Sequence, residues 1–164
     1  MEAVILMGIQ GAGKSTFYTS HFFHMHIRLS LDLLKTRGRE QAFMRTCFET
    51  GQCFVVDNTN VRAAQRAFYI AAAKQAGFRV KGYFLESPLS DALRRNAGRS
   101  GKALIPVPGV IGTFKRLERP SLAEGFDELY VVTHGNDGRF LVNPWQEQPV
   151  DTVPPAGPEP ETTE

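Results

Sequence analysis

Cysteine is scarce in this sequence: the chain holds two, Cys47 and Cys53, among 164 residues. Two cysteines are too few for the disulfide framework of a small secreted domain. We therefore expect both thiols to be reduced and packed in apolar surroundings. The first residues, MEAVILMG, also lack the basic start of a signal peptide. Together these absences predict a cytoplasmic protein.

Long hydrophobic runs are absent as well. No run approaches the roughly 18 apolar residues that cross a bilayer, so we expect no membrane segment. Basic residues are missing from the end of the chain, where five acidic residues follow from Glu147 onward. The residues before Glu147 therefore carry 19 basic against 12 acidic side chains, a net charge of +7. This surplus favours a polyanionic partner, and a bound nucleotide would account for part of it.

What the sequence does contain is one phosphate-binding pattern near its start. Residues 3–7 (AVILM) predict a buried strand, and residues 8–15 (GIQGAGKS) fit G-x-x-x-x-G-K-[ST] ahead of a helix-compatible run. The glycines let backbone N–H groups converge on a phosphate chain, and the helix adds its positive end. The expected ATP-binding residues of this segment are Gly8, Gly11, Ala12, Gly13, Lys14, Ser15 and Thr16. Lys14 would reach the β- and γ-phosphates and the Ser15 hydroxyl would hold Mg²⁺, with Thr16 in support.

Strands and helices are expected to alternate along the rest of the chain. Helices are predicted at 14–26, 39–50, 62–76, 89–96 and 110–120, and strands at 27–31, 53–57, 79–86 and 128–134, the last leading through a turn into 139–143. This alternation predicts a three-layer α/β fold with a mostly parallel sheet and helices on both faces. The phosphate loop would lie at its carboxyl edge. We expect one folded domain over 1–143 and a proline- and acid-rich tail over 144–164 that is disordered.

Two aspartates follow predicted strands at that edge. Asp32 is the candidate general base, with an N-cap or turn role as the alternative. Asp57 ends the VVD strand and is the candidate Mg²⁺-side carboxylate, acting through water, with a structural role as the alternative.

Several motifs of other nucleotide-binding classes are missing. No N-K-x-D follows the VVD strand, which argues against a GTPase, and no L-S-G-G-Q occurs, which argues against a transporter ATPase. Asn58 stands where many motor ATPases have a glutamate that activates water. What remains favours phosphoryl transfer to a bound hydroxyl group.

A basic stretch over 94–119 holds seven Lys or Arg and one acidic residue. Its glycine- and proline-rich part, about 95–109, is predicted to be a mobile lid. Arg95 and Arg99 flank that part, so one of them is expected to close over the ATP phosphates. For any single residue of this stretch, a solvated helix face is the alternative.

Four segments in order resemble one family: GIQGAGKST, SLDLLK, VVDNTN and RRNAGRSGKALIPVPG look like the kinase domain of phage and bacterial polynucleotide 5′-hydroxyl kinases. The resemblance runs from about Ile5 to Pro120, about 70% of the chain. It implies a P-loop kinase with ATP as donor, Mg²⁺ as cofactor and a nucleic acid 5′-hydroxyl end as acceptor. It also implies Asp32 as general base, Lys14 and Ser15 at the donor phosphates and metal, and Arg99 as the lid arginine.

The resemblance has one departure on the acceptor side. Lys35 stands where the phage enzyme has an arginine for the acceptor phosphate, and lysine is a point charge rather than a bidentate fork. Either Lys35 or Arg37 is then expected to bind the acceptor, with Asp57 and Asn60 beside it. Two other readings stay open, a small-molecule kinase such as a sugar or nucleoside kinase, and a nucleotide-binding module with little turnover.

Overall fold

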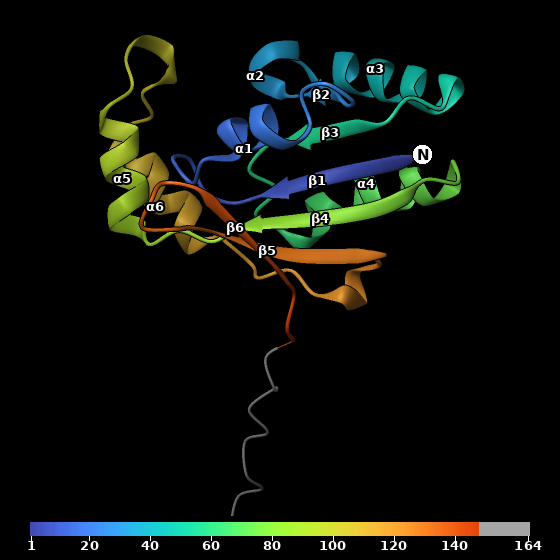
Figure 1. Cartoon of the computed structure of the whole chain (residues 1–164). Helices are drawn as coiled ribbons and strands as arrows, with labels where there is room; N and C mark the ends of the chain where they lie inside the picture. The colour runs from blue at the N-terminus through green and yellow to red at the C-terminus, as the bar shows by residue number, and fades with distance from the viewer. Residues whose placement is uncertain (148–164) are drawn as a thin grey trace, which may run out of the picture.

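A six-stranded sheet forms the centre of the protein in the computed structural model, which describes residues 1–147 (Figure 1). The strand order is β2-β3-β1-β4-β5-β6, in which all neighbours are parallel except β5 and β6. The strands are β1 (Glu2–Met7), β2 (Ile27–Leu29), β3 (Phe54–Asp57), β4 (Arg79–Leu85), β5 (Glu128–His134) and β6 (Phe140–Pro144). The helices are α1 (Lys14–His21), α2 (Leu31–Leu34), α3 (Arg37–Thr50), α4 (Ala63–Gln75), α5 (Leu89–Ala97) and α6 (Val107–Lys115), with short 3₁₀ turns η1 (Gly101–Ala103) and η2 (Leu122–Glu124).

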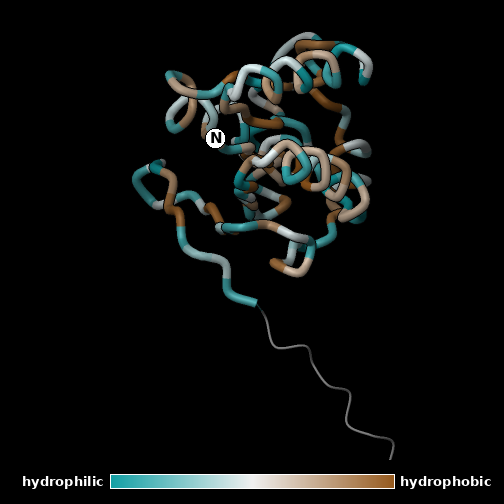
Figure 2. The backbone as a smooth tube through the Cα atoms, turned by 90° about the vertical axis from the view of Figure 1, so that its right-hand side faces the viewer, coloured by the Kyte–Doolittle hydropathy of each residue, from teal (hydrophilic) through white to brown (hydrophobic). Residues whose placement is uncertain are grey.

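Two hydrophobic clusters cover the two faces of the sheet. In β1, Ala3, Ile5 and Met7 face one cluster, which includes residues of α3 and α4. Val4 and Leu6 face the other, which includes residues of α1, α5 and α6. This alternation follows from the two-residue period of a strand buried on both faces. The helices in Figure 2 carry both hydrophobic and hydrophilic residues, as helices with one buried face do. The predicted three-layer α/β fold is confirmed.

Helix α1 is shorter than predicted, because it ends at His21 rather than continuing to residue 26. The chain turns after Phe22, where the N–H groups of Met25 and His26 donate to the Phe22 carbonyl, and then enters the edge strand β2. His26 is held there by Glu2, whose carboxylate lies 2.9 Å from His26 Nε2, and by the Tyr18 hydroxyl, which donates to the His26 carbonyl. The predicted strand 27–31 likewise ends early, at Leu29, and Asp32 lies in the first turn of α2.

The predicted lid contains more regular structure than expected. Residues 101–103 form η1, and α6 already begins at Val107, within the range predicted to be a loop. The same helix ends at Lys115, well before Pro120. It stops there because the next residues run along the loop before α4, where the Glu118 N–H donates to the Val61 carbonyl.

The end of the described chain is more ordered than predicted. The hairpin of β5 and β6 is confirmed, and it extends through Pro144. The Trp145 N–H donates to the Leu129 carbonyl, and the Glu147 carboxylate accepts from the Leu122 N–H. Residues 144–147, which were predicted to belong to a disordered tail, are thus hydrogen-bonded to the folded domain. The rest of the predicted disordered tail, 148–164, lies outside the described residues.

Two smaller expectations concern cysteine and membranes. Cys47 is buried, Cys53 is half-buried, and both are free thiols, as predicted. No helix within residues 1–147 combines the length and the apolar composition needed to span a bilayer.

Candidate functional site

The phosphate loop joins β1 to α1 at the carboxyl edge of the sheet and is closely packed by its neighbours. Gly11 has φ +81°, and a Cβ on it would lie 2.3 Å from the Ala92 carbonyl oxygen. Gly13 has φ +99°, and a Cβ there would meet the His134 ring at 3.1 Å. His134 Nε2 itself lies 3.0 Å from the Ala12 carbonyl oxygen. Both positions thus require glycine for backbone angle and for space.

Lys14 folds back over this loop. Its Nζ donates to the carbonyls of Gly8 and Ile9, at 2.8 and 2.9 Å. The pKa of Lys14 is lowered to about 8, mainly by burial; the positive charge of Arg99 also lowers it, whereas Asp57 and Asp32 partly offset this effect. The ammonium is therefore held where it has too little compensating negative charge. A bound phosphate chain would supply that charge.

Ser15 and Asp57 lie together beside Lys14. The Ser15 hydroxyl donates to Asp57 Oδ2 at 3.0 Å, and the Asp57 side chain is almost fully buried. Arg28 of β2 completes the group, because its Nε and Nη2 donate to the same Asp57 oxygen at 2.8 and 2.6 Å and Nη2 donates to Ser15 Oγ at 2.8 Å. The Asp57 carboxylate is thus paired with a guanidinium.

These oxygens fit a Mg²⁺ ion that arrives with a nucleotide. A hydroxyl and a carboxylate are hard oxygen donors, which Mg²⁺ prefers. Within residues 1–147 no group of three or more His, Cys, Asp or Glu side chains is arranged to hold a metal ion. Most ligands would therefore be phosphate oxygens and water, which is how Mg²⁺ is usually held in kinases. Arg28 lies close enough to compete for the same carboxylate.

A cavity of about 560 Å³ opens over the loop and brings most of the predicted site residues together. Lys14 and Ser15 line it from the phosphate side, and Asp32 lines it from α2 across the opening. Asp32 is exposed and lines the cavity, and its charge raises the pKa of Lys14. The further predicted residues among its lining are Gly11, Gly13, Lys35, Arg37, Asp57, Asn60 and Arg99. The phosphate loop and the Asp32 carboxylate thus border the same cavity.

The predicted acceptor-side residues differ in how free their side chains are. Lys35 has φ +69°, and its ammonium donates to the Asp32 carbonyl. About half of the Arg37 side chain is exposed, while its Nη1 donates to Glu40. Asn60 is buried, and its amide donates to the Leu6 carbonyl at 2.7 Å. The Asn60 amide is therefore engaged in holding the end of β1.

The two lid arginines, for which ATP contacts were predicted, lie in different places. Arg95 of α5 donates from Nε to the Gly11 carbonyl at 2.6 Å, so it braces the phosphate loop from behind. Arg99 follows α5, is exposed, and lines the cavity together with Lys102. Thr16 is exposed on the first turn of α1 and lies outside the set of residues that line the cavity.

Sequence reasoning missed three residues that organise this site. Arg28 is one, although a charged residue within a short strand between Ile27 and Leu29 is a usable signal. Glu40 is another, since it shares a buried helix face with Met44 and Cys47, where a charge requires partners. Asn58 belongs to the quoted VVDNTN segment, but the contacts of its amide depend on residues far away in the sequence.

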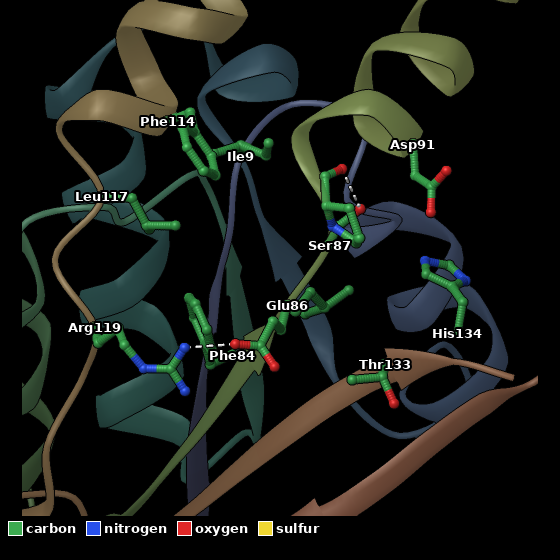
Figure 3. Close-up of a pocket in the computed structure, with 12 residues that line it drawn as sticks. Ile9, Phe84, Glu86, Ser87, Asp91, Phe114, Leu117, Arg119, Thr133 and His134 are labelled. Carbon is green, nitrogen blue, oxygen red and sulfur yellow. Dashed lines mark hydrogen bonds and ion pairs between the residues drawn. The ribbon is translucent and has the colours of Figure 1, made fainter. Parts of the chain in front are cut away.

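A second cavity, of about 730 Å³, lies beside the phosphate loop at the ends of β4 and β5 (Figure 3). Phe114 and Leu117 border it on one side, and Asp91 and His134 on the other. Arg119 and Glu86 form an ion pair of 2.5 Å at its rim. Apolar and charged side chains share its walls.

A curated relative matches most of the chain. The chain is 27% identical over 137 residues to the bifunctional polynucleotide phosphatase/kinase of Schizosaccharomyces pombe. The match covers 80% of this chain and 33% of that protein, so the chain spans about a third of the length of this relative.

Solved structures show the same fold at low sequence identity. A gluconokinase from Sinorhizobium meliloti 1021 aligns with a TM-score of 0.56 at 17% identity, covering 80% of this chain and 82% of that one. Kti12 from Chaetomium thermophilum, in complex with ADP-AlF3, aligns with a TM-score of 0.62 at 12% identity, covering 80% and 88%. The family model AAA_33, described as an AAA domain, matches residues 4–111. Since that match covers well over half of the chain, this protein belongs to the AAA_33 family of AAA domains and has the P-loop kinase fold.

Proposed function

We propose that this protein transfers the γ-phosphate of ATP to the 5′-hydroxyl end of a DNA or RNA strand. The observation that carries the proposal is that one and the same cavity is lined by Lys14 and Ser15 from the phosphate loop and by Asp32 from α2. A protein that only senses nucleotides has no use for an exposed carboxylate facing its phosphate site. A kinase needs such a group to accept the proton of the attacking hydroxyl.

The chemistry requires positioning and charge neutralisation. Asp32 would accept the proton of the acceptor hydroxyl while the oxygen of that hydroxyl attacks the γ-phosphorus. The bond between the γ-phosphorus and the oxygen that bridges the β- and γ-phosphates breaks, and ADP leaves. Lys14 and Arg99 would neutralise the charge that develops on the transferred group and on the leaving ADP. Mg²⁺, when bound through Ser15 and, by way of water, Asp57, would supply further neutralisation at the donor phosphates.

Three features support a nucleic acid acceptor. Lys35 and Arg37 line the cavity on the side of Asp32, where a phosphate next to the reacting hydroxyl would lie. The chain before Glu147 has a net charge of +7. The curated relative is a polynucleotide phosphatase/kinase, and the match includes 80% of this chain.

A direct test offers the protein different acceptors. Labelled ATP and Mg²⁺ are incubated with a 5′-hydroxyl oligonucleotide, with the same oligonucleotide carrying a 5′-phosphate, and with a panel of sugars and nucleosides. The proposal predicts label at the 5′ end of the first substrate only. Label on the sugars or nucleosides alone would overturn the nucleic acid assignment while leaving the kinase assignment in place.

A small-molecule kinase is the second candidate. The gluconokinase structure shares the fold over most of both chains, and a cavity of about 560 Å³ is large enough for a sugar. The same acceptor panel separates the two candidates, because only a nucleic acid kinase would require the phosphate that follows the reacting hydroxyl.

A further inference from the structure

A buried carboxylate lies behind the acceptor side of the cavity. Glu40 of α3 is fully buried, and its Oε2 accepts from Arg37 Nη1 at 2.8 Å and from the Tyr69 hydroxyl at 3.0 Å. Its Oε1 accepts from Asn58 Nδ2 at 2.7 Å. A buried charge is costly unless it is paired and hydrogen-bonded, so these three contacts account for its presence in the core.

Asn58 links this carboxylate to the helix of the candidate base. Its Nδ2 is directed to Glu40, so its Oδ1 is left to accept from the Leu31 N–H at 2.9 Å. Leu31 is the first residue of α2, a helix whose N-cap, Ser30, makes no side-chain capping bond. Asn58, in the loop after β3, therefore caps α2, and Asp32 is the residue after Leu31.

The same carboxylate also holds the acceptor-side cation. Arg37 donates to Glu40 with Nη1, and the hydroxyl of Tyr69 accepts from the same nitrogen. Burial and the Glu40 charge raise the pKa of Tyr69 to about 12, so this hydroxyl stays protonated and can donate to Glu40. Glu40 thus fixes one end of the Arg37 guanidinium while about half of that side chain stays exposed.

We propose that Glu40 and Asn58 are positioning residues for phosphoryl transfer: Glu40 orients the Asn58 amide, which places Asp32, and independently orients Arg37 toward the acceptor. This inference rests on the proposed function, because it assigns the network to the base and acceptor sides of the same site. The Glu40 carboxylate thus has two sets of contacts, which we call arms: the capping arm runs through Asn58 to α2, and the other runs to Arg37. The two arms predict different kinetic effects.

Two substitutions separate the arms. Asn58→Ala removes the cap of α2 and leaves the Glu40–Arg37 pair, so turnover falls while the KM for the acceptor stays level. Glu40→Gln places an amide donor against the Asn58 amide and weakens the hold on Arg37, so turnover falls and the acceptor KM rises. The loss of turnover is expected to be about 10²-fold, the effect of a displacement of about 1 Å in a reacting group. ATP affinity should stay level in both variants.

Glu2→Gln is the matched control. Glu2 is a half-buried carboxylate that also has two cationic partners, His26 and Lys81, but it lies at the amino end of β1, at the opposite edge of the sheet. Its substitution is expected to lower thermal stability without changing turnover. If Glu2→Gln lowers turnover as much as Glu40→Gln, the effect is one of stability alone and the proposal is wrong.

A purely structural role is tested by a mutant cycle and by an exchange of groups. In an Asp32→Asn background, Asn58→Ala should change turnover by no more than about twofold, because it acts through Asp32. Combining Glu40→Gln with Asn58→Asp reverses the hydrogen bond: the amide now at position 40 donates to a carboxylate at position 58, which still accepts from the Leu31 N–H. This pair should recover most of the lost turnover. Full additivity in the cycle, or no recovery in the pair, would overturn the proposal.

Hydrogen exchange tests the network without any assay of transfer. Asn58→Ala should raise the amide exchange rate of residues 31–34, and Glu2→Gln should not. If the wild-type protein transfers phosphate to no acceptor, the proposed function fails, and raised exchange in 31–34 would still support the capping arm. If Asn58→Ala leaves exchange in 31–34 unchanged, the positioning proposal fails even where transfer is observed.

Discussion

Lys14 is the residue whose charge depends most on what fills the phosphate loop. Its pKa is lowered to about 8, first by burial and then by Arg99. A phosphate chain favours the protonated form and raises that pKa, so nucleotide binding near pH 9 should take up protons. The affinity for nucleotide should fall as the pH rises above about 8, because more of the free protein must first be protonated.

Calorimetry in buffers of different ionisation enthalpy measures this proton uptake. Lys14→Arg is the control, since arginine stays protonated throughout this range and should abolish the uptake. If neither the wild-type protein nor Lys14→Arg takes up protons on binding nucleotide at pH 9, Lys14 keeps an ordinary lysine pKa.

Arg28 makes a second residue-level prediction, which concerns metal affinity. Its guanidinium is paired with Asp57, 2.6 Å away, and with Ser15. A positive charge about 4 Å away opposes each unit charge of a cation by ~4 kcal/mol at an effective dielectric constant of about 20. Arg28→Met should therefore tighten Mn²⁺ binding, followed by electron paramagnetic resonance without nucleotide, by about tenfold or more.

The matched control for Arg28 is Arg79→Met. Arg79 is also paired with a carboxylate, that of Glu128, but it lies on the surface at the other edge of the sheet. Its substitution should leave Mn²⁺ binding unchanged. Equal Mn²⁺ affinity in Arg28→Met and the wild-type protein would mean that Arg28 does not compete with the metal.

The lid is the element that carries the next prediction. Arg99 is exposed after α5 and lines the cavity, whereas Arg95 is held by the Gly11 carbonyl. A lid arginine that meets charge developing during transfer affects the transition state more than bound ATP. Arg99→Ala should lower turnover by about 10²–10³-fold, the range found for one lost charge-stabilising donor. Nucleotide affinity should change much less.

Arg94→Ala provides the comparison for Arg99, because Arg94 lies on α5, is paired with Asp91 and is not among the residues that line this cavity. It should retain full turnover. A rise in the nucleotide dissociation constant with level turnover would instead make Arg99 a contact of the ground state.

Some helices and strands could be predicted from the sequence with correct ends, and others could not. The buried strands and the phosphate loop were predictable, because apolar runs and glycine spacing are local signals. The ends of α1 and α6 were not, because they depend on distant partners: Glu2 contacts His26, and the Val61 carbonyl accepts from the Glu118 N–H. Interactions between residues remote in sequence leave little local trace.

The candidate site divides in the same way. The sequence pattern singled out Lys14, Ser15, Asp32 and Asp57, and the structure brings them into one cavity. It did not single out Arg28, which pairs with Asp57 across 29 positions of sequence. Pairings of this kind are decided by the strand order, which places β2 next to β3.

For the whole molecule, the described fold predicts where the chain can be shortened. Trp145 packs against Phe84 and Arg119, and Glu147 binds the Leu122 N–H. Ending the chain after residue 143 should therefore destabilise it by ~3 kcal/mol or more, the usual effect of deleting a packed tryptophan. Residues 148–164 hold five prolines and few apolar residues, so removing them should leave stability and transfer unchanged.

Thermal unfolding of the two truncated chains measures this directly. Equal melting temperatures for chains ending at 143 and 147 would show that Trp145 contributes nothing to the fold. Loss of transfer in the chain ending at 147 would give the segment that follows a role in the reaction.

The central claim is that the phosphate loop and α2 act together on one phosphoryl group, and Asp32→Asn tests it most directly. Asparagine has nearly the same shape and keeps an acceptor oxygen, and Asp32 is exposed in the first turn of α2, so folding, ATP binding and acceptor binding should stay level. As a far weaker base it should lower transfer from labelled ATP to the acceptor by about 10²–10⁴-fold. The measurement is single-turnover transfer by Asp32→Asn beside the wild-type protein, with nucleotide binding and melting temperature recorded for both. Transfer at the wild-type rate would contradict the account and would show that the catalytic base lies elsewhere.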